Sequence, residues 1–175
     1  MTTGYSAPAK VLHWLMALLI ACLLALGFDM VDLPLSPQKI QFFSYHKWAG
    51  VTVFFLVWLR MFWRLTHRPP SYPASMTALQ RSAAYSGHFA LYALMLAMPL
   101  SGWLMSSAKG VQTVWFGLLP LPDLLSRDKA LGSQLEVLHG AFAMGLVVLA
   151  GVHIAAALYH YFVRKDDILQ RMLPA

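Results

Sequence analysis

The chain has 175 residues, of which 59% are hydrophobic and 11% carry a formal charge. This composition lies far from that of a soluble globular domain and predicts an integral membrane protein. The net charge of +6 does not indicate a nucleic-acid-binding protein, because the basic residues flank apolar runs and form no solvated basic stripe.

The first apolar run covers residues 11–28 and predicts a membrane helix over residues 8–29. Ser6 and Pro8 precede the run as a candidate cap and a first-turn residue. Its 18 uncharged residues approach the roughly 20 that cross a bilayer. Because no clear small-residue cleavage site precedes Asp29, we interpret the run as an uncleaved helix and not as a signal peptide.

A proline-containing segment, residues 29–44, is predicted to be an exposed loop. The second predicted helix covers residues 45–65, with His46 at its head and Arg60 and Arg64 near its end. Neighbouring aromatic side chains place the two arginines at a membrane interface.

After a proline-rich segment that cannot be helical, the third predicted helix covers residues 82–107 and contains His88. The fourth predicted helix covers residues 136–164, in which 27 consecutive residues carry no formal charge. His139 and His153 are 14 residues apart there, which corresponds to about 40° around the helix and about 21 Å along it. They therefore share a face at opposite ends of the membrane.

Four spans place both termini on one side of the membrane. The termini and the second-to-third loop hold eight basic and two acidic residues, whereas the opposite side holds five of each. The positive-inside rule therefore predicts that both termini are cytoplasmic.

Histidines inside a membrane usually face a partner in the bundle interior. His46 and His139 lie at the outer ends of their helices, at similar depth, and are predicted to form a pair. For the inner half of the membrane, spacing alone does not settle the pairing among His13, His88, His153 and His160. A single one of these histidines could equally be an ordinary hydrogen-bonded residue of the bundle.

Two imidazoles from facing helices are the axial ligands that haem iron takes on both faces, and they leave no position open for oxygen. The pattern thus favours electron transfer. A histidine-based metal-ion carrier is an alternative, although no carboxylate lies inside the four apolar runs. Small residues near the histidines, namely Gly50, Gly140 and Gly151, would leave room for a planar group. Arg60 and Arg64 could pair with its carboxylates or only anchor the helix.

Several segments in this order resemble the bacterial cytochrome b561 family of small di-haem membrane proteins. They are KVLHWLMALLI, YHKWAGVTVFFLVWLRMFWRL, GHFALYALMLAMPLSGW, FGLLPLP and LHGAFAMGLVVLAGVHIAAALYHYFVRKDDILQRMLP. The resemblance implies an all-α membrane protein, with one domain over residues 1–175 and two b-type haems within a four-transmembrane-helix bundle. It implies that His13 and His153 bind the cytoplasmic haem, and His46 and His139 the periplasmic one.

The resemblance further implies electron exchange with ubiquinone or another quinone in the bacterial inner membrane. The nearest members resemble superoxide:quinone oxidoreductases. On that basis Lys47 is a candidate for attracting superoxide or another small donor, or else an interfacial lysine. His160 is a candidate for the quinone pocket, and His88 for that pocket or for a contact beside a haem ligand. An alternative function is an electron-relay cytochrome b subunit of a larger dehydrogenase or hydrogenase.

Overall fold

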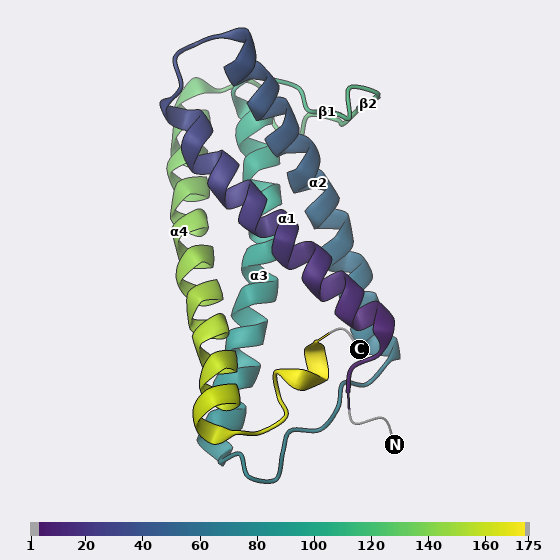
Figure 1. The fold of residues 1–175 in the computed structure, drawn as a ribbon. Coiled ribbons are helices and arrows are strands. Elements are labelled where there is room, and N and C mark those ends of the chain that lie inside the picture. Colours follow the sequence, from purple (N-terminus) through teal and green to yellow (C-terminus); the bar gives the residue numbers. More distant parts are fainter. Residues whose placement is uncertain (1–3, 174–175) are drawn as a thin grey trace.

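Four long helices run up and down beside one another within residues 4–173, which are the residues that this computed structural model describes (Figure 1). They are α1 (Ala7–Asp32), α2 (Pro37–Thr66), α3 (Ala78–Ala108) and α4 (Lys129–Tyr159). The shorter elements are strands β1 (Val114–Trp115) and β2 (Leu119–Pro120), the π-helical turn η1 (His160–Arg164) and the 3-10 turn η2 (Gln170–Met172). The predicted all-α, four-transmembrane-helix class is confirmed.

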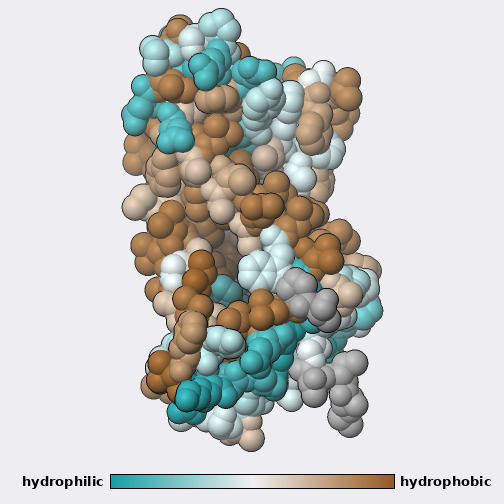
Figure 2. Space-filling view, in the orientation of Figure 1, coloured by the Kyte–Doolittle hydropathy of each residue, from teal (hydrophilic) through white to brown (hydrophobic). Residues whose placement is uncertain are grey.

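The surface of the bundle is apolar around its middle. Figure 2 shows hydrophobic side chains gathered there and polar ones gathered mainly toward the two ends. Side chains of all four helices are exposed there, including Leu18 at 63%, Phe89 at 76% and Val152 at 61%. All four helices are also long and apolar enough to cross a bilayer. The exposed apolar surface is therefore the surface that contacts lipid.

The prediction of a loop over residues 29–44 is wrong. α1 continues to Asp32 and α2 already begins at Pro37, so that only residues 33–36 connect the two helices. Ser36 caps α2 by accepting a hydrogen bond from the Lys39 amide at 3.2 Å, and Pro37 occupies the first turn. A serine followed by a proline is common both in loops and at the first residues of a helix, and here it begins a helix.

The third and fourth helices also begin earlier than predicted, at residues 78 and 129 instead of 82 and 136. A capping box between Thr77 and Gln80 starts α3. Asp128 starts α4, because its carboxylate accepts hydrogen bonds from the amides of Ala130 and Leu131 at 2.9 and 3.1 Å. Apolar length indicates only where a helix lies in lipid, whereas capping determines where it begins.

The two ends of the bundle differ. The hairpin end carries the antiparallel pair β1–β2, in which Val114 pairs with Pro120, and the Trp48 indole of α2 donates to the Val114 carbonyl at 2.7 Å. At the terminal end the start of α1 and the turn η2 lie close together (Figure 1). There the Tyr5 amide donates to the Arg171 carbonyl at 3.1 Å. The described chain therefore starts and finishes at the same end of the bundle.

Candidate functional site

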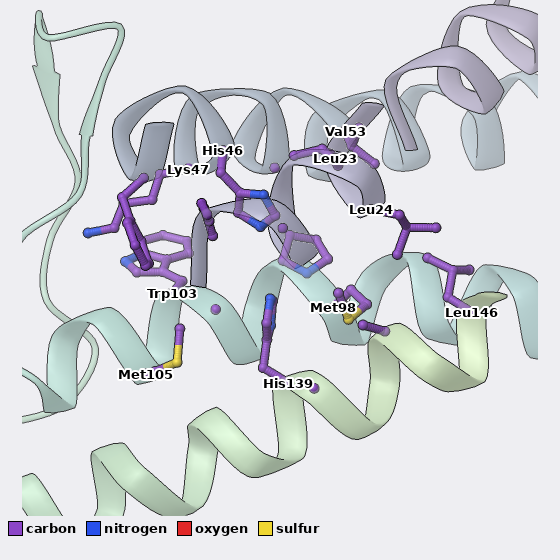
Figure 3. Close-up of a pocket in the computed structure, with 18 of the residues that line it drawn as sticks. Leu23, Leu24, His46, Lys47, Val53, Met98, Trp103, Met105, His139 and Leu146 are labelled. Carbon is purple, nitrogen blue, oxygen red and sulfur yellow. The ribbon is translucent and has the colours of Figure 1, made fainter. Parts of the chain in front are cut away.

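Two histidines face each other near the hairpin end. His46 extends from α2 and His139 from α4, with ring centres 6.3 Å apart and an angle of 74° between the ring planes. Figure 3 shows the two rings pointing toward each other across a cavity, with Met98 and Trp103 beside them. The structure therefore brings together the two histidines that their similar depth in the sequence predicts as a pair.

The cavity around this pair has a volume of about 350 Å³ and mostly apolar walls. Gly50 and Gly140 line it, one turn after His46 and directly after His139. A Cβ added to either glycine would have no heavy atom within 4 Å. Open space thus lies beside both rings, as expected if these small residues leave room for a planar group. Gly151 also borders open space.

Two further glycines contact the rings themselves. A Cβ added to Gly27 of α1 would lie 3.1 Å from Cε1 of His46, and one added to Gly102 of α3 would lie 3.1 Å from Cε1 of His139. These distances are shorter than an ordinary van der Waals contact, so a side chain at either position would require the histidine ring to shift by a few tenths of an ångström. Sequence reasoning missed both, because each glycine is on a different helix from the histidine it touches.

A second histidine group lies nearer the terminal end. The ring centres of His13 on α1 and His153 on α4 are 6.1 Å apart, while His88 on α3 lies 5.5 Å from His153. The Nδ1 atoms of His88 and His46 are buried without a hydrogen-bond partner among residues 4–173. His153 therefore has two neighbouring imidazoles, which is the ambiguity that helical spacing leaves open.

Arginine side chains line a second cavity, of about 520 Å³, at the terminal end. Arg60 donates from Nε to the Tyr92 hydroxyl at 3.0 Å, and Arg64 lies one turn later on α2. The three ion pairs found within residues 4–173 include neither arginine. Their charge is thus available to an acidic group that enters the cavity.

A small apolar layer lies between the two histidine groups. Met16 of α1 and Val53 and Val57 of α2 are its buried residues. Met16 is one turn beyond His13, and Val53 is two turns beyond His46, so the layer separates the two groups along the bundle. Tyr92, Met95 and Leu96 of α3 pack against it.

The remaining predicted residues lie at opposite ends. Lys47 lines the hairpin-end cavity and donates from Nζ to the Val111 carbonyl at 3.2 Å. His160 lies at the terminal end, where its Nδ1 is 2.6 Å from the Asp166 carboxylate and both side chains are nearly buried. Lys165 has a φ of 52°, which turns the chain back so that Asp166 reaches His160. Sequence reasoning did not single out Asp166, because its role depends on that turn.

The histidine pairs have the geometry that haem requires. An imidazole nitrogen lies about 2 Å from the metal it binds, so two rings on opposite sides of one metal have centres roughly 6 Å apart. The measured separations are 6.3 and 6.1 Å. Within the described residues, no three His, Cys, Asp or Glu side chains gather as a metal site. Two facing imidazoles beside open space suit a metal ion whose remaining coordination positions are filled by a planar ring, as in haem.

A membrane bundle of four helices with facing histidine pairs at two depths defines the class of membrane haem proteins that transfer electrons. Comparison with known proteins specifies the family. The match to the family described as prokaryotic cytochrome b561 extends over residues 4–175. The chain belongs to the prokaryotic cytochrome b561 family, and its cofactors are b-type haems, typically two per chain.

Individual relatives agree with this assignment. Cytochrome b561 homolog 2 of Escherichia coli (strain K12) is 34% identical over 97% of this chain and 90% of its own length. Cytochrome b561 homolog 1 of the same organism is 30% identical over 97% of both chains. A protein of Yersinia pestis named probable superoxide oxidase CybB is 27% identical over 97% of this chain and 96% of its own. The chain is therefore a bacterial membrane cytochrome of electron transport.

We expect Gly102→Ala to reduce the haem bound per chain, because the added methyl group would displace the His139 ring. Alanine favours a helix by about 1 kcal/mol over glycine, so a loss of haem would not reflect a weakened α3. The measurement is the haem-to-protein ratio from the reduced-minus-oxidised spectrum. Gly145→Ala on α4 is the control, since an added Cβ there would meet only Leu94 Cδ1, at 3.4 Å, and Gly145 lines neither cavity. Equal haem content in both variants would contradict the role of Gly102.

Proposed function

We propose that this cytochrome is a superoxide:quinone oxidoreductase. It takes electrons from superoxide at the hairpin end and delivers them to a ubiquinone-type quinone at the terminal end. The observation that carries the proposal is the difference between the two ends: a cavity with a lysine at one, and a buried His160–Asp166 pair at the other. The name of the Yersinia pestis relative, probable superoxide oxidase, supports the choice of donor.

The axial ligands form part of the proposal. His46 and His139 bind the iron at the hairpin end, and His13 and His153 bind the iron at the terminal end. The separations of 6.3 and 6.1 Å between ring centres support these two pairs. His88, at 5.5 Å from His153, lies beside the second pair and contacts it as a neighbour.

Arg60 and Arg64 are proposed to hold the haem carboxylates at the terminal end. Both line the second cavity, and a guanidinium forms paired hydrogen bonds with a carboxylate. The Tyr92 hydroxyl, which accepts from Arg60 Nε, holds the guanidinium in place.

When bound, the two haems supply one-electron transfer between the ends of the bundle. Two superoxide anions each lose one electron and leave as oxygen. A quinone takes up the two electrons together with two protons and leaves as quinol. The chain itself must therefore attract an anion at one end and provide protons at the other.

Lys47 is proposed to attract the anion. It lines the hairpin-end cavity beside His46 and donates a hydrogen bond to the Val111 carbonyl. Asp123 lies near enough to interact with its charge but forms no ion pair with it. Glu136 lines the same cavity, but its carboxylate is 2.8 Å from Lys109 Nζ, which offsets the negative charge. A cavity with a net positive wall raises the association rate of an anion.

The His160–Asp166 pair is proposed to serve the quinone. Asp166 accepts the hydrogen on Nδ1 of His160 and so orients the ring. In the protonated, imidazolium form of the ring, which the Asp166 carboxylate stabilises, Nε2–H donates to a quinone oxygen and delivers that proton. We place the protein in the bacterial inner membrane with this end in the cytoplasm. Eight basic and only two acidic residues lie at this end, and cytoplasmic segments of membrane proteins carry such an excess of basic residues.

The ligand assignment is tested by His46→Ala and His13→Ala. We expect each variant to keep one of two haems, because each removes an axial ligand of one iron only. The haem-to-protein ratio measures this. His67→Ala, which changes a histidine stacked on Trp63, is expected to keep both haems. A variant of His46 or His13 that keeps both haems would refute its assignment.

Superoxide oxidation is tested with the purified chain in detergent, supplied with a superoxide-generating system and a soluble ubiquinone. We expect quinol to form with the chain alone, which an electron-relay subunit of a larger complex would not achieve. Lys47→Glu should slow the superoxide-dependent rate by about tenfold and flatten its dependence on salt. Lys129→Glu makes the same change of charge at the hairpin end outside the cavity and should leave the rate near that of the wild type. Equal rates in the two variants would refute steering by Lys47.

Quinone reduction is tested with His160→Ala and Asp166→Asn. We expect His160→Ala to lower the quinone-dependent rate by about 10²-fold, as for loss of a proton donor, with Asp166→Asn intermediate. Reduction of the haems by superoxide should persist in both. Asp167→Asn is the control, because that carboxylate pairs with Arg171 and not with His160. Unchanged turnover and quinone affinity in His160→Ala would exclude this site.

A further inference from the structure

Ser101 of α3 contacts one of the two facing histidines at the hairpin end. Its side chain is buried, with 3% of the residue surface exposed. The hydroxyl oxygen lies 2.8 Å from the Met98 carbonyl oxygen and 2.9 Å from Nδ1 of His139. A buried serine in a helix often bonds to a preceding carbonyl, so the first contact is ordinary. The second contact reaches a different helix and a ring of the haem site.

The two contacts together determine where the protons lie. A hydroxyl group has one hydrogen, and a carbonyl oxygen can only accept. At 2.8 Å the Ser101 hydroxyl must therefore donate its hydrogen to Met98. Its oxygen then has only lone pairs left for His139, so Nδ1 of His139 carries a hydrogen and donates it to Ser101. The lone pair of the imidazole is consequently on Nε2.

His46 has no side-chain contact of this kind. Its buried Nδ1 meets no hydrogen-bonding side chain among residues 4–173 and faces the backbone carbonyl of Leu23. Gly27 and Gly102 leave the two rings similar room, as an added Cβ would lie 3.1 Å from Cε1 of each ring. The facing rings thus have comparable steric surroundings but different hydrogen bonding. A hydrogen bond from the distal nitrogen of a metal-bound histidine fixes the tautomer and makes the ligand more basic.

We propose that Ser101 is a positioning residue that presents Nε2 of His139 to the hairpin-end haem and lowers the reduction potential of that haem alone. This inference rests on the proposed role of His139 as a ligand. A more basic imidazole stabilises the oxidised iron relative to the reduced iron, which sets the direction of the effect. Because the Ser101 hydroxyl contacts His139 and not His46, Ser101 acts on this haem through His139.

The test is a redox titration of purified Ser101→Ala followed in the visible spectrum. We expect both haems to remain, the midpoint potential of one to become more positive, and the other to stay unchanged. Repeating the change in a His13→Ala background, which retains only the hairpin-end haem, assigns the shifted potential. Ser106→Ala is the control, because Ser106 is also buried in α3 and its hydroxyl donates to Val111 and not to a histidine. Unchanged potentials in Ser101→Ala, or an equal shift of both, would overturn the proposal.

A matched pair of variants separates the hydroxyl from the shape of the side chain. Ser101→Thr keeps the hydroxyl and Ser101→Val replaces it with a methyl group of similar size, so Val should show the more positive potential. Equal potentials in Thr and Val would overturn the proposal even if Ser101→Ala fails to fold. His139→Ala tests the underlying assignment separately. Retention of both haems there would refute His139 as a ligand, whereas unchanged potentials in the Ser101 variants would refute only the role of Ser101.

Discussion

The structure depends on the cost of placing imidazole side chains inside a lipid bilayer. Such groups must face the interior of the bundle and find partners there, while the surface toward lipid stays apolar. In this cytochrome that constraint yields His46 opposite His139 and His13 opposite His153, each pair bridging two helices at a separation that suits haem iron. The helices are arranged around these contacts, and the exposed surface carries leucine, valine and phenylalanine.

Small residues leave the open space beside the facing rings of His46 and His139. Gly50 and Gly140 leave room beside the rings, whereas Gly27 and Gly102 let the rings approach neighbouring helices. Between the two sites the buried side chains of Met16, Val53 and Val57 form an apolar layer. The two centres thus share one bundle but occupy separate surroundings, so that residues near one can change it without changing the other.

The two ends of the bundle differ in the polar side chains that they carry. At the hairpin end the loop after α3 lies over the cavity, with Lys47 bonded to its backbone. At the terminal end the turn at Lys165 brings Asp166 back to His160, and the Arg171 carbonyl accepts a hydrogen bond from the Tyr5 amide. An anion donor at one end and a proton-requiring acceptor at the other are consistent with this division.

The sequence by itself determined the four spans, the common end of the two termini and the similar depth of His46 and His139, because apolar length and helical rise are local properties. It also carried enough ordered motifs to indicate the family. The predicted starts of the second and fourth helices were wrong: these helices begin at Pro37 and Lys129. The capping residues that start them lie outside the apolar runs from which the helices were predicted. Only the tertiary structure decided that both His13 and His88 adjoin His153, that Gly102 and Ser101 touch His139, and that Asp166 reaches His160. These contacts depend on how each helix is rotated and tilted against its neighbours and on a single left-handed turn, which no spacing along the chain specifies.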